Sequence, residues 1–277
     1  MDKLKYLNTG ILNNRERERQ IYFMYKYNIT EIWCENSGQK IYGVAYMPEV
    51  DGKVPLVIYA HELCHTHKAG SGYARELASY GIAVYTFDFR GGSYDSKSDG
   101  KTTEMSVMTG VSDLEAVIAA AKIWDFVDTD KIYLLGGSQG GMSAAVMAER
   151  HPEVVAGLML LYPAFVIPDV VHDQFHSLKN VPEQFNWMGW IMVGKNYASD
   201  VWDYDPYRQM KNYPGPVLIL HGDRDMLVDI SYSQKAAEHY PNVSLHMIEG
   251  AGHIFSGPSF QLAVEFILNF LQTELGI

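Results

Sequence analysis

The sequence feature that most constrains the fold is the run at residues 136–140, which reads G-x-S-x-G with Ser138 at its centre. An apolar run at residues 132–135 precedes it, and a helix-like run at residues 142–149 follows it. A serine between a strand and a helix in this pattern is typical of a nucleophile elbow, a sharp turn that exposes the hydroxyl above a parallel sheet. The alternative is a glycine-rich turn that only closes a strand–helix unit. A base and an acid later in the chain would favour the first interpretation.

Short apolar runs rich in strand-forming residues alternate with helical patterns along the whole chain of 277 residues. The expected strands are residues 29–33, 41–47, 55–60, 82–87, 132–135, 154–161, 217–221 and 243–248. Several are apolar on both faces, as strands of a parallel sheet covered by helices must be. The alternation predicts an α/β fold with a mostly parallel, doubly wound central sheet and helices on both faces. The first two strands, joined by a turn at Asn36-Ser37-Gly38, are expected to form an antiparallel hairpin at a sheet edge.

One segment, residues 165–210, interrupts this alternation. It is dense in aromatic residues and longer than an ordinary connection between a strand and a helix. We therefore expect an inserted cap between two late strands, covering the site. The core domain would then comprise residues 1–164 and 211–277. A single crossover helix with long loops is the alternative.

Charge and cysteine content restrict the partners and the compartment. The formal net charge of -11 provides no basic field for phosphates, so neither a nucleic-acid nor a membrane partner is expected. Two cysteines, Cys34 and Cys64, are too few for a disulfide framework and favour free thiols in a reducing cytoplasm. Residues 1–25 lack the apolar core of a secretory signal, and no run is long enough to span a bilayer. A cytoplasmic protein is predicted, and a homodimer stays open.

An acid and a histidine follow the last two expected strands, in the order that this type of site requires after the serine. A serine hydroxyl needs an adjacent base, and the base needs an orienting carboxylate. We expect Ser138 to be the nucleophile, His253 the base and Asp225 the acid, with Asp223 as the alternative acid. His221, at the end of the first of these two strands, is expected to be structural.

Two backbone N–H groups must also face the oxyanion that develops during attack on a carbonyl. Gln139, directly after the nucleophile at a helix N-terminus, is expected to supply one of them. The loop after the strand at residues 55–60 reads His61-Glu62-Leu63, and the N–H of Leu63 is the expected second donor.

With these residues in place, the chain resembles an α/β-hydrolase, and specifically the small bacterial cinnamoyl (feruloyl) esterase group. The resemblance extends over roughly residues 29–274, and it is carried by Phe87-Asp88-Phe89-Arg90-Gly91-Gly92, Ser98-Asp99-Gly100-Lys101, residues 136–140, Tyr162-Pro163-Ala164, His221-Gly222-Asp223-Arg224-Asp225 and Gly250-Ala251-Gly252-His253. It implies a serine carboxylesterase that cleaves small or aromatic acyl esters, hydroxycinnamoyl esters among them, through an acyl-enzyme and without a cofactor or metal. It also implies that the cap contacts the acyl group of this small-molecule substrate. The expected contacts are Asp169, Gln174, Trp187, Trp190 and Tyr197.

The oxyanion loop departs from the family pattern. The family usually has His-Gly there, whereas this chain has His61-Glu62. Glutamate allows the backbone less freedom than glycine, and a carboxylate inside the site would repel the oxyanion. We therefore expect the Glu62 side chain to point away from Ser138. A few extra residues around Tyr94 to Lys97 lengthen a second loop, which is expected near the entrance.

The same loop matches H-E-x-x-H from His61 to His65, a zinc-protease signature. That motif needs a helix, on which residues i and i+4 share one face, and here it directly follows a strand. A zinc-dependent hydrolase is therefore disfavoured. A non-catalytic binding protein of this fold would be expected to lack a triad residue. A thioesterase, a monoacylglycerol-type lipase and a peptidase stay open as other serine hydrolases.

Overall fold

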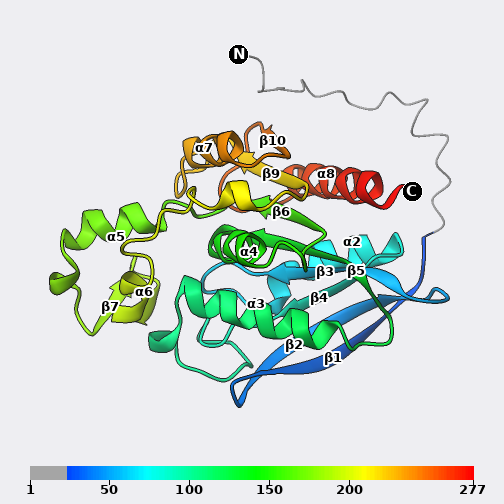
Figure 1. Ribbon diagram of the computed structural model, residues 1–277, viewed down its shortest axis with the longest axis horizontal. Helices are drawn as coiled ribbons and strands as arrows, with labels where there is room; N and C mark the ends of the chain where they lie inside the picture. Colours follow the sequence, from blue (N-terminus) through cyan, green and yellow to red (C-terminus); the bar gives the residue numbers. More distant parts are fainter. Residues whose placement is uncertain (1–23) are drawn as a thin grey trace.

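A computed structural model describes residues 24–277, which build one large sheet flanked by helices (Figure 1). The strands lie in the order β1-β2-β4-β3-β5-β6-β9-β10. Their bounds are β1 Tyr27–Asn36, β2 Gln39–Pro48, β3 Val54–Ala60, β4 Ala83–Phe87, β5 Val127–Gly137, β6 Gly157–Leu161, β9 Val217–Gly222 and β10 Val243–Ile248. From β4 to β10 every neighbouring pair is parallel, which confirms the mostly parallel α/β sheet. Residues 1–23 of the expected core domain lie outside the described residues.

β1 and β2 form an antiparallel hairpin at one edge of the sheet, and this expectation is confirmed. Ser37 and Gly38 connect the two strands with backbone φ angles of 53° and 80°. Two left-handed residues in succession match the twist of the flanking strands in a two-residue turn. β2 then pairs antiparallel with β4, so the parallel part of the sheet begins at β4.

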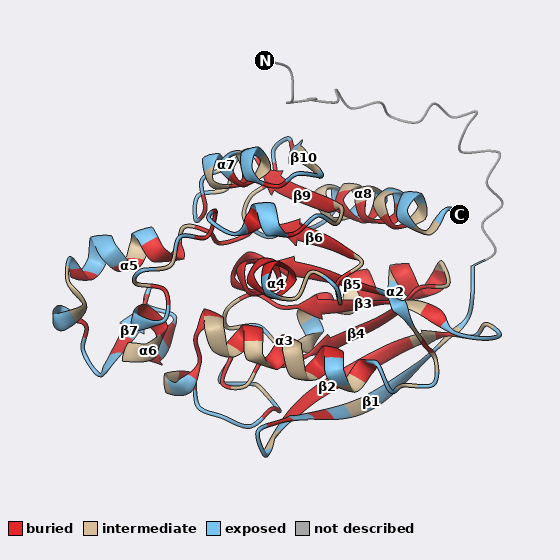
Figure 2. Cartoon of the chain, in the orientation of Figure 1, coloured by how far each residue is buried: buried red, intermediate tan, exposed pale blue. Residues whose placement is uncertain are grey.

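Helices cover both faces of the sheet. α2 (Ser71–Ser79) and α8 (Pro258–Leu275) pack on one face, and α3 (Val107–Ala121), α4 (Ser138–Arg150) and α7 (Ser231–His239) pack on the other. α3 and α8 bury the apolar stripe that a period of 3.6 residues predicts. Examples are Val111, Leu114 and Val117 in α3, and Ala263, Ile267 and Leu271 in α8. Figure 2 shows the central strands coloured as buried along most of their length, as expected for a sheet that helices shield on both sides.

Within residues 24–277, none of the helices combines the length and the apolar character that crossing a bilayer requires.

β6 begins later than its apolar pattern suggests. The sequence is apolar from residue 154, but the chain is still turning there, because the N–H of Val154 donates to the carbonyl of His151 at 3.1 Å. Val155 is nevertheless buried in the core. Apolar character in this stretch therefore reflects burial, and the strand itself starts only at Gly157.

Residues 165–210 leave the sheet after β6 and return to it at β9. They contain α5 (Ile167–Phe175), an antiparallel hairpin of β7 (Gln184–Trp187) and β8 (Ile191–Gly194), and α6 (Lys195–Ser199). Figure 1 shows these elements gathered at the left end of the molecule. A side chain on Gly194 would come 2.1 Å from the carbonyl oxygen of Thr103, so this glycine lets the hairpin lie directly on the loop before α3.

Glu149 is a buried carboxyl group in the last turn of α4. It is 5% exposed, and the hydroxyls of Tyr204 and Tyr240 each lie 3.4 Å from one of its carboxylate oxygens. Burial raises the pKa of Glu149 from 4.5 to about 8, although both hydroxyls oppose the shift. The folded chain therefore holds this proton more tightly than the unfolded chain does. The resulting stabilisation is complete below the unfolded pKa and is lost as the pH rises through the folded pKa.

Glu149→Gln is expected to remove this pH dependence. At about pH 9 the variant should exceed the parent protein in free energy of unfolding by on the order of 2 kcal/mol, because no buried carboxylate remains to be ionised. At about pH 5 the two proteins should differ little. Urea unfolding followed by tryptophan fluorescence at both pH values measures the difference, with the exposed Glu153 changed to Gln as the control. Equal stabilisation at both pH values would contradict the assignment.

Candidate active site

Ser138 occupies a strained turn between β5 and α4. Its backbone φ is 49°, in the left-handed region, which costs a residue other than glycine on the order of 1–3 kcal/mol. Neighbouring glycines make the turn sterically feasible. A side chain on Gly140 would come 2.2 Å from the carbonyl oxygen of Ala60, and one on Gly136 would come 2.6 Å from that of Gly140. The turn places the Ser138 hydroxyl at the carboxyl end of β5 and at the start of α4.

His253 and Asp225 approach Ser138 from the loops that follow β10 and β9. His253 Nε2 lies 2.8 Å from Ser138 Oγ, and His253 Nδ1 lies 2.7 Å from Asp225 Oδ2. The three side chains that the sequence suggests as one set are thus brought together in a continuous chain of hydrogen bonds. Asp223, the alternative acid, instead accepts from the N–H of Gly250 at 2.6 Å and joins the two loops. The arrangement can pass the serine proton to the imidazole.

The Asp225 side chain is fully buried and well supplied with donors. Its Oδ1 accepts from the N–H groups of Leu227 and Val228, both at 2.9 Å, and its Oδ2 lies 3.2 Å from His221 Nε2. Burial alone raises the pKa of the Asp225 carboxyl. Hydrogen bonds from His221 and His253 outweigh that effect and hold the pKa well below its ordinary value. Asp225 is therefore an ionised partner for His253.

His221 supports the acid, a role that its sequence did not reveal. It is 0% exposed, its Nδ1 lies 2.7 Å from Ser233 Oγ, and its Nε2 lies 2.9 Å from the Val228 carbonyl oxygen. With the proton on Nε2, the ring donates to that carbonyl and also faces Asp225. The spacing of four residues between His221 and Asp225 is the only signal in the sequence that could have suggested the contact.

The N–H groups of Gln139 and Leu63 have no acceptor within residues 24–277. Gln139 lies in the first turn of α4, where backbone N–H groups lack a partner within the helix. Leu63 lies in the turn after β3, and the next residue, Cys64, has a φ of 64°. The N–H of Cys64 donates to the carbonyl of Gly92 at 3.1 Å, which ties this turn to the loop after β4. Both N–H groups are therefore free to bind an oxyanion.

The His61–His65 segment forms a turn and not a helix. His61 is buried, with its Nδ1 2.7 Å from the Glu62 carbonyl oxygen and its Nε2 accepting from the N–H of Phe89 at 3.0 Å. Burial lowers the pKa of His61, which favours the neutral ring that this pair of contacts requires. His65 Nδ1 lies 3.0 Å from the carbonyl oxygen of Leu63. The shared helical face that the zinc signature needs is thus missing from this segment.

Glu62 lies behind the elbow and is 5% exposed. Its Oε1 accepts hydrogen bonds from the hydroxyls of Tyr59 and Tyr162, both at 2.9 Å. Within residues 24–277 its carboxylate makes no hydrogen bond to Ser138. The carboxylate is therefore held by the two tyrosines.

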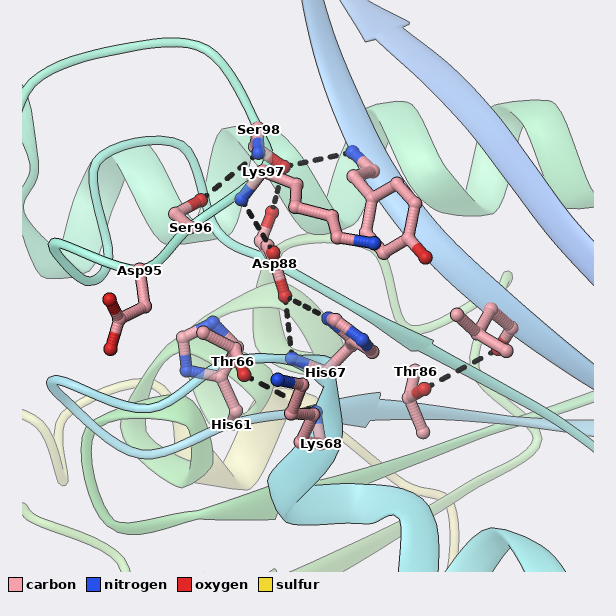
Figure 3. A network of polar contacts seen from close by, with 12 residues as sticks. His61, Thr66, His67, Lys68, Thr86, Asp88, Asp95, Ser96, Lys97 and Ser98 are labelled. Carbon is pink, nitrogen blue, oxygen red and sulfur yellow. Dashed lines mark hydrogen bonds and ion pairs between the residues drawn. The ribbon is translucent and has the colours of Figure 1, made fainter.

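Asp88, just after β4, fixes the loop that contains Lys97 (Figure 3). Its Oδ1 accepts from the N–H of His67 and lies 2.6 Å from His67 Nδ1, while its Oδ2 accepts from the N–H of Lys97 at 2.8 Å. One carboxylate thus joins the segment after the oxyanion loop to the loop that carries Tyr94. The Tyr94 hydroxyl in turn accepts from the N–H of Met192 in β8 at 2.9 Å. The lengthened loop therefore bridges the oxyanion loop and the hairpin.

Two of the residues expected to contact substrate are joined to the elbow. Trp187 and Tyr197 are buried, and the centroids of their rings are 4.8 Å apart. The Tyr197 hydroxyl donates to Gln139 Oε1 at 2.6 Å, and Gln139 Nε2 lies 3.2 Å from the sulfur of Met105. Tyr197 therefore holds the side chain of Gln139, whose N–H is one of the two expected oxyanion donors.

The other three residues expected to contact the substrate are not joined to the elbow in this way. Asp169, in the first turn of α5, accepts from the hydroxyl of Tyr232 in α7 at 2.7 Å. Gln174 is exposed on α5, and Trp190 is half exposed in the turn between β7 and β8. In the part of the chain that the structure describes, none of these three has a hydrogen bond or ring contact with the triad.

Tyr197→Phe is expected to lower kcat by about three- to tenfold with a smaller change in KM. The loss of the hydroxyl leaves Gln139 Oε1 without its donor, at a net cost of about 1 kcal/mol, and loosens a residue that is expected to bind the oxyanion. Steady-state kinetics on a p-nitrophenyl ester measure the effect. Tyr213→Phe is the control, because Tyr213 is also 0% exposed but donates to the Val155 carbonyl near the amino end of β6. Equal kcat losses in both variants would argue against a specific role for Tyr197.

The model of the prolyl oligopeptidase family matches residues 71–277, which include the elbow and both loops that carry the acid and the base. The chain belongs to the prolyl oligopeptidase family. The match begins at α2, so the hairpin β1–β2, β3 and the oxyanion loop precede the segment that this family model covers.

Some of the individual proteins that are similar to this chain are named as esterases. Esterase EstD of Thermotoga maritima is 26% identical over 256 residues, which cover 81% of this chain and 60% of that protein. The quorum-quenching protein AidA of Acinetobacter baumannii is 21% identical over 288 residues, which cover 87% of this chain and 94% of that protein. The structure of Est1E from Butyrivibrio proteoclasticus with bound ferulic acid has a TM-score of 0.81 and 26% identity, covering 89% of this chain and 100% of that chain. The protein is thus an α/β-hydrolase, and a serine hydrolase of the esterase type.

Proposed function

We propose that this protein is a carboxylesterase that cleaves esters of small or aromatic acids with Ser138, His253 and Asp225. The observation that carries the proposal is the unbroken hydrogen-bonded chain from Ser138 Oγ through the imidazole to the buried carboxylate, with distances of 2.8 and 2.7 Å. A nucleophile, a base and an orienting acid in this geometry are what acyl transfer from an ester requires.

In the first half of the reaction, His253 Nε2 takes the proton of Ser138 while Oγ attacks the ester carbonyl carbon. The N–H groups of Gln139 and Leu63, together with the positive end of α4, stabilise the negative charge on the carbonyl oxygen. His253 then gives its proton to the alcohol oxygen as the bond from that oxygen to the carbonyl carbon breaks. Asp225 holds the Nδ1 proton throughout and stabilises the charged imidazole.

In the second half, water takes the place of the alcohol. His253 removes a proton from the water as its oxygen attacks the acyl carbon, and then returns the proton to Ser138 Oγ as the acyl bond breaks. The products are one carboxylic acid and one alcohol, and the enzyme is restored. Residues of the chain supply every proton transfer, so the proposal invokes no cofactor or metal.

An aromatic acyl group, with hydroxycinnamoyl esters as the specific case, is the proposed substrate class. Tyr197 is hydrogen-bonded to Gln139 at the elbow and packs against Trp187, so residues 165–210 place aromatic side chains at this end of the sheet. The similar structure of Est1E holds ferulic acid. We accordingly propose residues 165–210 as a cap that borders the acyl site, set into a core of residues 1–164 and 211–277. The proposed partner is a small-molecule ester.

A peptidase is the second candidate, because the matching family is described by an oligopeptidase. Activity on four substrates distinguishes an esterase from a peptidase: methyl ferulate, p-nitrophenyl acetate, p-nitrophenyl octanoate and a proline p-nitroanilide. We expect the highest kcat/KM on methyl ferulate and a value at least about a hundredfold lower on the anilide. The highest value on the anilide would replace the proposal by a peptidase, and the highest value on the octanoate would replace it by a lipase.

A further inference from the structure

Three residues at the active site share a left-handed backbone conformation. Cys64 follows the oxyanion loop, Ser138 forms the elbow, and Tyr162 directly follows β6, with φ angles of 64°, 49° and 39°. None of them is glycine, and such residues keep this conformation only where the surrounding structure holds them. The three segments follow different strands, so whatever holds them relative to one another must be a tertiary contact.

A single carboxylate lies where these segments meet. Glu62 belongs to the first segment, two residues before Cys64. A side chain on Gly137, directly before Ser138, would lie 2.3 Å from Glu62 Oε1, so the carboxylate packs against the backbone of the elbow. The same Oε1 accepts from the hydroxyl of Tyr162 at 2.9 Å. Glu62 thus contacts all three segments.

Tyr162 extends this contact to the base. Its ring lies against that of His253, with centroids 4.8 Å apart and planes inclined by 50°. Its backbone N–H donates to the carbonyl of Leu220 in β9 at 2.7 Å, so the residue is held at both ends. Packing against this ring restricts the rotation of an imidazole that must keep its Nε2 directed at Ser138.

We propose that Glu62 is a positioning residue, which sets the oxyanion loop, the elbow and His253 relative to one another through its hydrogen bonds with Tyr59 and Tyr162. The inference rests on the proposed function, because it concerns the same triad. The Glu62 side chain packs against the backbone of the elbow and holds it in place.

The Glu62 carboxylate is anchored through only one of its two oxygens within the described residues. Glu62 Oε1 takes both tyrosine hydroxyls, while Oε2 has no hydrogen-bond partner in the described part of the chain. The same is true of the hydroxyl of Tyr73, whose ring is stacked on Tyr59 with centroids 5.9 Å apart. Loss of the Tyr162 hydroxyl alone would therefore remove one of the two donors that direct Glu62.

The test compares kcat and KM for Glu62→Ala, Glu62→Gln and Tyr162→Phe on one p-nitrophenyl ester. Glu62→Ala should lower kcat by about 30- to 100-fold with KM within about threefold, because the misplaced groups act in the transition state. Glu62→Gln keeps the shape and an acceptor oxygen, and it should restore kcat to within about tenfold of the parent. Tyr162→Phe, which keeps the ring, should lower kcat by about tenfold.

Glu149 provides a matched control. It is also 5% exposed and lies near two tyrosine hydroxyls, but it sits at the far end of α4 from the elbow. Glu149→Ala should keep kcat within about twofold of the parent, since it shares no partner with the triad. Circular dichroism and thermal unfolding establish that each variant is folded before its kinetics are compared.

Parental kcat in folded Glu62→Ala would overturn the proposal, as would a loss carried by KM or an equal loss in Glu149→Ala. If Glu62→Ala does not fold, Tyr162→Phe decides, and an unchanged kcat in that variant overturns the proposal. Ser138→Ala, measured alongside, separates this inference from the proposed function. Turnover by Ser138→Ala refutes the triad itself, whereas an inactive Ser138→Ala with a fully active Glu62→Ala refutes only the positioning role.

Discussion

The Ser138→Ala variant is expected to lose about 10³- to 10⁶-fold in kcat on p-nitrophenyl esters. Without Oγ, no atom lies 2.8 Å from His253 Nε2 to attack the carbonyl carbon. What remains is substrate binding and the N–H groups of Gln139 and Leu63, which by themselves support only weak catalysis. The loss should therefore appear in kcat and not in KM. Initial rates over a range of substrate concentrations separate the two constants.

Ser143→Ala is the control for the nucleophile variant. Ser143 also lies in α4 and is 1% exposed, but its hydroxyl donates to the carbonyl of Val107 in α3 at 3.1 Å. Its replacement should leave kcat near the parental value. Near-parental turnover by a folded Ser138→Ala protein would refute the nucleophile assignment.

The second large effect is expected for Asp225→Asn, which should lower kcat by about 10⁴-fold. The new amide can still accept from the N–H groups of Leu227 and Val228 through Oδ1, so the loop should stay in place. It cannot supply the negative charge that stabilises a protonated His253. If its NH₂ group faces Nδ1, it also favours the wrong tautomer, with the proton on Nε2 where Ser138 needs an acceptor.

Asp223→Asn tests whether this effect is specific to one carboxylate of the loop. Asp223 is two residues away and accepts from the N–H of Gly250, a contact that an amide oxygen can keep. We expect kcat within a few-fold of the parent for this variant. A loss in Asp223→Asn as large as that in Asp225→Asn would show that the assay reports loop disruption and not the charge of the acid.

Much of the fold could be predicted because parallel strands that are buried on both faces leave a local signal in the sequence. The hairpin turn at Ser37 and Gly38 was equally local. The β7–β8 hairpin was not predictable in this way, since each of its strands has only four residues. Its place depends on contact with the loop before α3, where Gly194 meets Thr103, and no local preference encodes such a contact.

The same distinction between local signals and tertiary contacts applies to the candidate site. Ser138, Asp225 and His253 could be proposed as one set because each follows a strand end within a recognisable turn, and the structure places them within hydrogen-bonding distance. Their catalytic roles stay predictions. Two contacts could not be predicted from the sequence. One is that of His221 with Asp225, and the other is the hydrogen bond from Tyr162 to Glu62. In the second case the partners are 100 residues apart, and only the pairing of strands brings them together.

The class of fold and the residues to consider as nucleophile, base and acid follow from sequence patterns, because hydrophobic period and turn glycines act locally. The contacts of Glu62 and Tyr197, in contrast, depend on how distant parts of the chain pack together. A glutamate beside an oxyanion site can repel the developing charge or brace the loop, and the outcome depends on where its carboxylate points. That direction is set by two hydroxyls. Tyr59 lies only three residues before Glu62, whereas Tyr162 reaches Glu62 only because β3 and β6 lie on either side of β5 in the same sheet.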